Sequence, residues 1–540
     1  GRLDKAWVEQ MAAELLHNLP ETPSASRPAP DIDREAHHAF ARRAAAECAV
    51  LLKNGGGLLP LAPGTRVAVI GDFADSPRFQ GGGSSCVNPT RVDRPLDCLK
   101  ESGLAVAGYA PGFRRHGGAD AELLTQAVEL AKKADVVLAY LGLDERAETE
   151  GLDREILALR DNQNTLLEAV AAVNPNVAVV LTCGAPVELP WIAHCKALLL
   201  AGLGGQAGAG GVAAVLTGRV NPSGKLAESW PLQLEDTPCA PWYPGRERTA
   251  EYREGPFVGY RYYQTARVPV RFPFGFGLSY TSFAYRELEA TPRQVSFTLI
   301  NTGPVAGAEI TQLYIAKPDS RLFRPALELK GFAKVHLEPG ESRRVTIPLD
   351  EYAFRYFNVK TGRWEVEGGT YQVMIGASCA DIRLSGSIAV DGTGAPAPYD
   401  LSGLSHYATG QIHQVTDQEF TALLGRPISP ARWDRAAPLT ENDTFSQLSY
   451  AKGWVGRLVY RILRHQAERA VSAEKPDLNA LFRLGMPFRA VAKMTAGMVD
   501  MGMVRALLEV FNGRFCQGAT HLLWAWHRKR RLDRKGDMSI

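Results

Sequence analysis

The chain of 540 residues is 45% hydrophobic and 22% charged, which excludes a disordered protein and leaves room for about three or four globular domains. Its formal charge of +3 is small for this length, so we expect neither nucleic acid nor a membrane as a partner. The eight cysteines form no CxxC pair and several lie in apolar runs, which predicts buried free thiols, no metal site and a reducing, cytoplasmic location.

Residues 1–60 are predicted to form a helical linker segment. Apolar residues recur at helical spacing over residues 4–19, and the Pro- and Ser-rich stretch 20–31 favours a flexible connection. Asp33 is a suitable N-cap for a second helix, which we expect to run through residues 36–54 and to end at the glycines that follow. Because the chain begins with GRLDKAW and not with methionine, we expect its natural N-terminus to lie upstream.

Strand and helix patterns alternate between residues 61 and 240. Short, continuous apolar strands separated by amphipathic helices are typical of a parallel sheet covered on both faces, a doubly wound α/β sandwich. The expected strands are RVAVIGDF, LAVAGYAPG, DVVLAYLGL, NVAVVLTCGAPVELP and CKALLLAGLGG. The expected helices are ADAELLTQAVELAKKA, NQNTLLEAVAAVN and GAGGVAAVLTG.

A connector rich in aromatic residues and proline is expected over residues 241–284. In residues 285–395, apolar residues alternate with polar ones, and turn signals such as NTG, EPGE and EGGT separate the runs. This pattern predicts an antiparallel β-sandwich of the immunoglobulin or fibronectin type III kind. Its alternating apolar positions include Val295, Phe297, Leu299, Val345, Ile347, Leu349, Tyr371, Val373 and Ile375.

Residues 396–540 are predicted to form a mostly helical C-terminal extension. Met494, Met498 and Met501 repeat at helical spacing, and we expect them to fill a core. The basic end HRKRRLDRK is interpreted as a solvated helix end, since no basic domain accompanies it.

A loop rich in carboxylates follows the strand DVVLAYLGL. In an α/β sheet, ligands usually bind just past the carboxyl ends of the strands, which makes this loop a candidate site. The alternative is that its acidic residues are simply solvated. The loop contains Asp144, Glu145, Glu148, Glu150 and Asp153.

A second candidate is the glycine-rich stretch GDFADSPRFQGGGSSCVNP, which follows the first strand. It lacks both the GK[ST] ending and the GxGxxG spacing, so a nucleotide site is disfavoured. Its glycines can let the loop approach a ligand closely, with Arg78, Gln80 and Ser84 as hydrogen-bonding groups. The absence of GxSxG and HExxH motifs excludes the hydrolase and metalloprotease classes that use them.

Six motifs follow one another along the chain: LLKNGGGLLPL, VAVIGDFADSPRFQGGGSS, ETEGLDR, LTGRVNPSGKLAESWP, YREGPFVGYRYY and FPFGFGLSYTSF. In sequence and order they resemble the part of glycoside hydrolase family 3 that follows its catalytic barrel. The resemblance covers roughly residues 35–395, and the nearest relatives look like β-glucosidases. It implies an α/β sandwich domain followed by a fibronectin type III-like domain, and the helical tail after Asp400 is similar to extensions on some bacterial members.

The resemblance implies hydrolysis of β-linked glucosides with retention, which needs two carboxyl groups about 5–5.5 Å apart. The family's acid/base is the Glu of an E-G-x-D-R pattern, which here is Glu150, with Glu148 as the runner-up. The pKa of this acid must be raised by burial or by a neighbouring carboxylate. For Asp153 and Arg154, an ion pair between them that fixes the loop is an equal alternative to substrate contact. The other expected substrate-binding residues are Arg78, Gln80, Ser84 and Ser85.

The family's nucleophile is an Asp on a (β/α)₈ barrel, a fold of about 250 residues that we do not find in this sequence. We therefore expect a fragment, or one product of a split or cleaved enzyme, that is inactive alone. The predicted partners are a β-glucoside or oligosaccharide and the missing barrel, in cis or in trans, with no cofactor. The alternative is a non-catalytic carbohydrate-binding or scaffold protein that uses the β-sandwich. A nucleotide-binding α/β protein is a third hypothesis.

Overall fold

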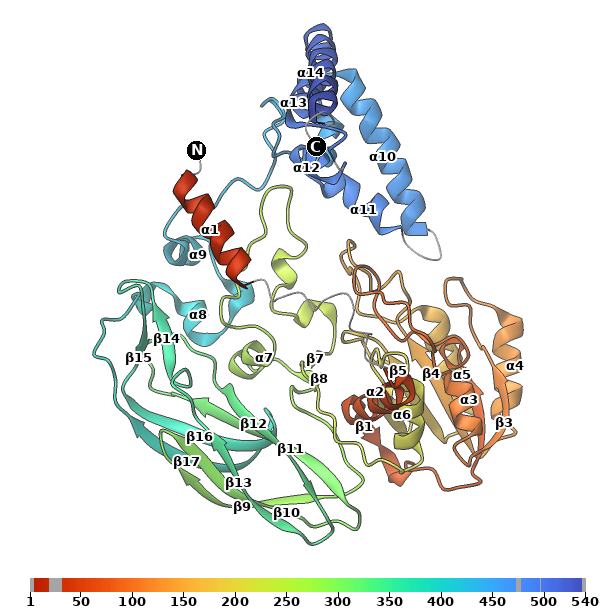
Figure 1. Cartoon of the computed structure of the whole chain (residues 1–540). Helices are drawn as coiled ribbons and strands as arrows, with labels where there is room; N and C mark the ends of the chain where they lie inside the picture. Colours follow the sequence, from red (N-terminus) through yellow and green to blue (C-terminus); the bar gives the residue numbers. More distant parts are fainter. Residues whose placement is uncertain (1–3, 19–31, 473–476, 496, 537–540) are drawn as a thin grey trace. The chain divides into compact units, whose positions relative to one another are not determined.

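The computed structural model (Figure 1) describes four stretches of the chain, residues 4–18, 32–472, 477–495 and 497–536. The chain divides into two compact units, residues 1–40 and 41–540. The predicted N-terminal helix is present as α1 (Lys5–Asn18), whereas the predicted linker 20–31 lies outside the described residues. Asp33 precedes α2 (Arg34–Cys48) and accepts a hydrogen bond from the Ala36 N–H at 2.9 Å, which confirms the predicted cap.

The predicted second helix is shorter than expected, and the segment after it is a strand. α2 ends at Cys48, and β1 (Val50–Asn54) pairs antiparallel with β6 (Ala197–Leu200) at one edge of the main sheet. A short apolar run fits a helix and a strand equally well by its pattern, and here the pairing with β6 decides. The prediction of a helix through residue 54 is therefore wrong.

The remaining predicted elements of the α/β domain are present, with one additional helix, α3. The strands are β2 (Arg66–Ile70), β3 (Ala105–Ala110), β4 (Val136–Gly142) and β5 (Val177–Thr182). The helices are α3 (Pro95–Lys100), α4 (Ala121–Ala131), α5 (Asp161–Val173) and α6 (Gly208–Leu216). The sheet order is β1-β6-β5-β4-β2-β3, and β2 to β6 pair in parallel. α3 packs with α6 and α4 with α5, and right-handed crossovers put these pairs on opposite faces of the sheet.

The strand order reverses between β2 and β4. From β2 the chain moves outward to β3, then returns past β2 to β4 and continues to β5 and β6. At such a point the loops after the two strands diverge and leave a crevice. The loop after β2, residues 71–94, contains the glycine-rich stretch, and the loop after β4, residues 143–160, contains the carboxylates. We call them the glycine-rich loop and the acidic loop, and they meet at this crevice.

The predicted β-sandwich follows, with two antiparallel sheets of order β13-β10-β9 and β12-β11-β16-β17 and a separate β14-β15 hairpin. All nine predicted alternating residues are buried in its core, because successive side chains of a strand point to opposite faces. The strands are β9 (Phe283–Ala290), β10 (Gln294–Asn301), β11 (Gly307–Ala316), β12 (Glu328–Leu337), β13 (Ser342–Pro348), β14 (Arg355–Asn358), β15 (Arg363–Val366), β16 (Gly369–Ser378) and β17 (Asp381–Val390).

The connector between the two domains contains the short strands β7 (Trp230–Pro231) and β8 (Val270–Phe272) and the helix α7 (Tyr260–Ala266). Its aromatic side chains do not pack alone. Phe257, Tyr262 and Tyr263 form one hydrophobic cluster with Tyr407 and Ile412, which come after the sandwich. These later residues lie in and near α8 (Ser405–Thr409), which α9 (Asp417–Leu424) follows.

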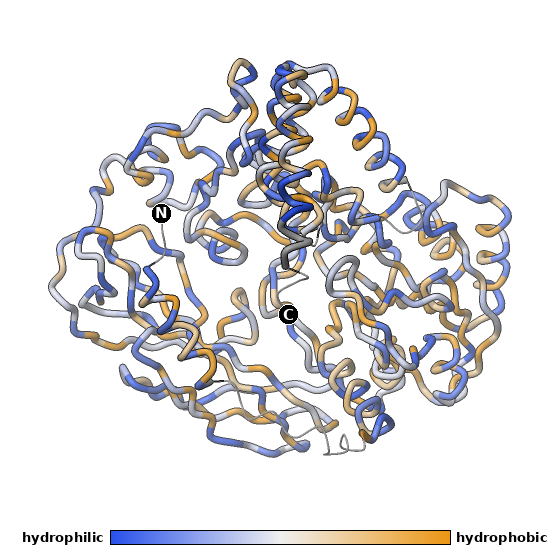
Figure 2. Tube along the Cα trace, turned by 45° about the horizontal axis from the view of Figure 1, so that its top comes forward, coloured by the Kyte–Doolittle hydropathy of each residue, from blue (hydrophilic) through white to orange (hydrophobic). Residues whose placement is uncertain are grey.

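The C-terminal extension is helical, as predicted, and has a core of its own that includes Leu448, Phe488 and Leu508. Its helices are α10 (Trp454–Ser472), α11 (Leu478–Gly485), α12 (Phe488–Met494), α13 (Met501–Phe511) and α14 (Phe515–Gly536). The expected methionine core is wrong for Met494 and Met498, which are 70% and 72% exposed, whereas Met501 packs against the core as predicted. The helical pattern breaks between Met494 and Met498, since α12 ends at Met494. α14 becomes hydrophilic toward its C-terminal end (Figure 2).

All eight cysteines are unpaired. The prediction of buried thiols holds for Cys183, Cys195 and Cys379, whereas Cys48, Cys86 and Cys516 are exposed. Within the described stretches the sheets form no closed barrel. The helices of these stretches include none that is both long and apolar enough to cross a bilayer.

Candidate active site

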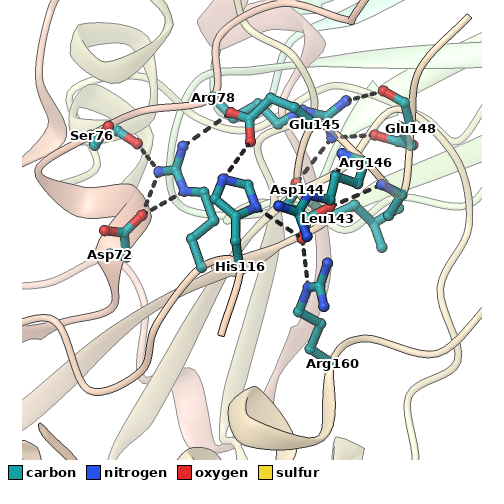
Figure 3. A network of polar contacts seen from close by, with 12 residues as sticks. Asp72, Ser76, Arg78, His116, Leu143, Asp144, Glu145, Arg146, Glu148 and Arg160 are labelled. Atoms are coloured by element: carbon teal, nitrogen blue, oxygen red, sulfur yellow. Dashed lines mark hydrogen bonds and ion pairs between the residues drawn. The ribbon is translucent and has the colours of Figure 1, made fainter. Parts of the chain in front are cut away.

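A buried ion pair joins the glycine-rich loop to the acidic loop (Figure 3). The Arg78 side chain is only 2% exposed, and its guanidinium pairs with the Glu148 carboxylate. Arg78 also donates hydrogen bonds to the backbone carbonyls of Leu143 at 3.0 Å and Glu148 at 3.1 Å. The N–H of Gly184, after β5, donates to both Glu148 oxygens at 2.9 and 3.0 Å. Glu148 therefore links the acidic loop to the glycine-rich loop and to the loop after β5.

A second arginine, Arg115, joins the same two loops from the segment after β3. It donates to Asp72 of the glycine-rich loop at 2.6 Å and to Glu145 of the acidic loop at 3.0 Å. It also donates to the Ser76 carbonyl, and its guanidinium lies 4.4 Å from the centre of the Phe73 ring. The first turn after β2 is thereby fixed to the start of the acidic loop.

The Asp144 carboxylate is buried at the base of the acidic loop and has a structural role. It accepts hydrogen bonds from Arg160 at 2.5 Å and from the Ala147 N–H at 2.9 Å, and the His116 ring lies 3.5 Å away. Burial opposes its ionisation, but the hydrogen bonds from Arg160 and Ala147 prevail and lower the pKa of Asp144. The Asp144 carboxylate is thus charged, and its hydrogen bonds fix the base of the acidic loop.

Glu150, by contrast, is exposed, and its hydrogen-bond partner among the described residues is Ser84 of the glycine-rich loop. Its carboxylate accepts hydrogen bonds from the Ser84 N–H at 2.8 Å and the Ser84 hydroxyl at 2.7 Å. These two bonds lower the pKa of Glu150. The raised pKa that an acid catalyst needs is therefore not present in these surroundings. Gly151 follows at a φ of 85°, which bends the chain at a position where other residues would be strained.

The other predicted residues of the glycine-rich loop have different roles. The Gln80 side chain braces the loop internally, because its amide donates to the Val87 carbonyl at 3.2 Å and accepts from the Val87 N–H at 2.9 Å. Ser85 is exposed beside Ser84. Four residues of this loop were predicted to bind substrate. Of these, Arg78 is buried and paired with Glu148, and Ser84 donates hydrogen bonds to Glu150.

Asp153 and Arg154 bond with different partners and not with each other. Arg154 donates to the backbone carbonyls of Pro186 at 2.8 Å and Leu157 at 3.0 Å, and burial lowers its pKa. Asp153 bonds with the Tyr243 hydroxyl, and burial together with this carboxylate raises the pKa of Tyr243. The Asp153–Arg154 ion pair, one of the two alternatives for these residues, is not formed, although Arg154 does hold the loop through the two carbonyls.

A pocket of about 470 Å³ lies between the two loops. The glycine-rich loop can approach the acidic loop because Gly82 has no side chain. A Cβ atom there would lie 2.7 Å from the Thr149 hydroxyl oxygen. The lining includes Pro77, Arg78, Gln80, Gly82, Arg115 and Thr149. The sequence predicts that these glycines let the loop approach a ligand, and in the structure Gly82 lets it approach the acidic loop.

Sequence reasoning missed Arg115, His116, Arg160 and Gly184, because their partners lie 16 or more residues away in the chain. The one available signal was position, since Arg115 and His116 follow β3 on the same sheet edge as the two loops. In the stretches that the structure describes, His, Cys, Asp and Glu do not gather in a group of three or more that could hold a metal ion.

Comparison with known proteins gives two family matches. Residues 49–280 match the glycosyl hydrolase family 3 C-terminal domain, and residues 309–379 match the fibronectin type III-like domain. The chain is 46% identical to thermostable beta-glucosidase B of Acetivibrio thermocellus over 372 residues, which are 67% of this chain and 49% of that protein. It is 44% identical to an exo-alpha-(1->6)-L-arabinopyranosidase of Bifidobacterium breve over 419 residues, 74% of this chain and 55% of that protein.

Among solved structures, the Bifidobacterium adolescentis GH3 beta-glucosidase matches with a TM-score of 0.70 at 42% identity, covering 78% of this chain and 62% of that chain. The chain spans about half the length of the curated relatives it matches. Fold, motif order and both family matches agree. Over these residues the chain therefore belongs to glycosyl hydrolase family 3, as the family's C-terminal α/β domain followed by a fibronectin type III-like domain.

Proposed function

We propose that the chain serves the hydrolysis of O-glycosyl bonds, as the acid/base-bearing part of a retaining, exo-acting, β-glucosidase-like enzyme. Glu150 is the proposed proton donor to the departing oxygen. The observation that supports this most is its position, an exposed carboxylate on the acidic loop at the reversal of strand order. The loop that carries it is fixed from below by the Arg78 and Arg115 contacts.

Glu148 is the weaker candidate for the acid because both of its oxygens are engaged by Arg78 and Gly184. Protonation of Glu148 would leave the buried Arg78 charge uncompensated, which is costly. We therefore assign Glu148 to positioning the loop. Ser84 then orients Glu150, and Gly151 gives the sharp turn that follows it.

The lowered pKa of Glu150 determines what the proposal requires of the rest of the enzyme. Retention needs a second carboxyl about 5–5.5 Å from the first. A carboxylate brought that close raises the pKa of Glu150, because two like charges disfavour each other, and a closed site adds desolvation in the same direction. We propose that a (β/α)₈ barrel, in cis or in trans, supplies this nucleophile, and that the chain without it does not turn over substrate.

The names of the relatives guide the choice of substrate. Both beta-glucosidases and an arabinopyranosidase are among them, so we propose a β-glucoside or the non-reducing end of an oligosaccharide, with an α-L-arabinopyranoside as the second substrate to test. No cofactor is required for acid/base and nucleophilic carboxylates. The unpaired thiols support a cytoplasmic location.

The test is an assay of this chain alone and mixed with the separately expressed barrel segment of a relative. The chain alone should not hydrolyse an aryl β-glucoside, and the mixture should. In the mixture, Glu150→Gln should reduce kcat/KM, which reports the step that expels the leaving group, at least about 100-fold on an alkyl glucoside, and much less on a dinitrophenyl glucoside, whose leaving group needs no proton.

Glu155→Gln is the matched control, because Glu155 is an exposed carboxylate of the same loop. It should leave both rates unchanged. Turnover by the chain alone that Glu150→Gln abolishes would contradict the need for a barrel. An equal loss of kcat/KM on both leaving groups would contradict the role of Glu150 as the acid.

A further inference from the structure

The charge of the chain is segregated, which its total of +3 conceals. Residues 451–540 contain 17 Lys and Arg against 7 Asp and Glu, a formal charge of +10. The preceding 450 residues therefore have a formal charge of −7. A strongly basic helical region on an otherwise acidic protein is a feature that whole-chain arithmetic cannot show, and it implies an anionic partner for this region.

Large apolar side chains are exposed on the same region. On α14, Leu523 is 61% and Trp524 76% exposed. The opposite side of this helix packs on α13, where Gly518 lets the two backbones come close. Trp526 is also exposed, and the Arg530 guanidinium lies 4.1 Å from the centre of its ring. α14 thus combines aromatic and aliphatic groups with arginine on its free surface.

α10 also has exposed apolar side chains. Trp454, Leu458 and Ile462 follow one another at intervals of four residues and are 62%, 45% and 51% exposed. The Trp454 ring stacks with that of Phe515, the first residue of α14, at a centroid distance of 6.4 Å. The two helices therefore meet at their first residues, and Arg461 lies beside Ile462 on α10.

Three kinds of partner could cover such a surface, and the chemistry favours one. A second copy of the chain would bring two basic regions together, which repel. A nucleic acid would satisfy the arginines and stack on tryptophan, but it has no use for exposed Leu458, Ile462 and Leu523. An anionic bilayer surface satisfies all of them, because aliphatic side chains enter the acyl boundary, tryptophan lies at the headgroups and arginine pairs with anionic lipid.

We propose that α10 and α14 dock the protein on the surface of an anionic lipid bilayer, without crossing it. This proposal departs from the expectation of no membrane partner, which rested on the charge of the whole chain. It is independent of the proposed glycosidase function. The occupant is the lipid headgroup layer, and the contact combines insertion of Leu523 and Trp524 with pairing of the basic side chains.

The experiment is co-sedimentation of the full chain with vesicles of phosphatidylcholine alone and with vesicles containing phosphatidylglycerol. We expect binding to the anionic vesicles only, with loss in high salt. Arg461→Glu and Arg531→Glu should each weaken binding by at least about fivefold, the effect of one charge near the surface. Trp524→Ser should weaken it by about tenfold through lost apolar insertion.

Two controls have matched chemistry elsewhere. Trp364→Ser changes a tryptophan that is 61% exposed on β15, and Arg293→Glu changes an exposed arginine before β10. Neither should alter binding. The proposal is overturned by equal binding to both vesicle types, by binding to neither, by wild-type binding of Trp524→Ser, or by a salt-sensitive complex with single-stranded RNA that forms without lipid binding.

Discussion

Ser84 donates two hydrogen bonds to the Glu150 carboxylate, from its N–H at 2.8 Å and its hydroxyl at 2.7 Å, across 66 residues of sequence. Both donors favour the charged form of Glu150, so they oppose its use as an acid. In the proposed role of Glu150, the same contact orients the carboxylate before substrate arrives. A residue that both positions an acid and lowers its pKa must be balanced by another group.

Ser84→Ala should raise the pKa of Glu150 toward its usual value, because one of the two stabilising donors is lost while the N–H remains. The pKa can be followed by NMR titration of the carboxyl carbon, with Glu150→Gln to identify the signal. Ser85→Ala is the control and should leave it unchanged. In an active assembly the alkaline limb of the rate profile should move to higher pH. An unchanged or lower pKa in Ser84→Ala would refute the assigned cause.

Arg78→Met should destabilise the α/β domain by about 3–5 kcal/mol, because it leaves the Glu148 carboxylate without its buried partner. The double variant Arg78→Met, Glu148→Gln should recover part of this loss. The free energy of unfolding can be obtained from calorimetry or urea titration. Arg464→Ala breaks an exposed pair with Glu468 and should cost less than about 0.5 kcal/mol. Equal effects of Arg78→Met and Arg464→Ala would show that burial of the first pair has no energetic weight.

Gly82→Ala should displace the acidic loop, since the new methyl group meets the Thr149 hydroxyl at 2.7 Å. We expect faster hydrogen exchange in residues 144–150 and a changed pKa of Glu150. Adding Thr149→Ala should partly reverse both effects. Gly118→Ala is the control because no atom lies within 4 Å of its Cβ position. If Gly82→Ala and Gly118→Ala behave alike, the close approach of the two loops is not the reason for the glycine.

The cysteines should differ in reactivity with their burial. Burial raises the pKa of Cys195 to about 11 and that of Cys379 to about 12, so few thiolates form near neutral pH. A maleimide at pH 7.5 should therefore label the exposed Cys86 and Cys516 quickly. It should label Cys195 and Cys379 slowly, as measured by mass spectrometry of peptides. In urea all should react. Fast labelling of Cys379 in the folded chain would contradict the described packing of the sandwich.

The architecture was predictable wherever a pattern repeats. Continuous apolar runs identified β2 to β6, and strict alternation identified the faces of β10, β13 and β16, because burial on two faces or on one leaves a periodic trace. β1 has no such trace, since VLLKN is too short to distinguish helix from strand. Met494 and Met498 had the right spacing but lie on either side of a helix end, which spacing alone does not mark.

The candidate site was predictable as a place more than as a set of contacts. Its two loops could be located because they follow apolar strands. Arg78 and Glu148 are 70 residues apart, and nothing in either segment shows that they pair. The sequence predicts Arg78 as a substrate-binding residue but does not show that its guanidinium pairs with Glu148. Glu150 was identified through family resemblance, and its hydrogen bonds to Ser84 were not foreseen.

β1 has a practical consequence for dividing the protein. It covers the edge of β6 on one side, and on the other the Leu278 N–H donates to the Leu51 carbonyl at 2.8 Å, so five residues seal the sheet and tie it to the connector. The matched family region begins at residue 49, just before this strand. A recombinant α/β domain that starts at Arg66 would expose the unpaired backbone of a hydrophobic strand, which recruits strands from other molecules. Its soluble form therefore has to begin upstream of Val50.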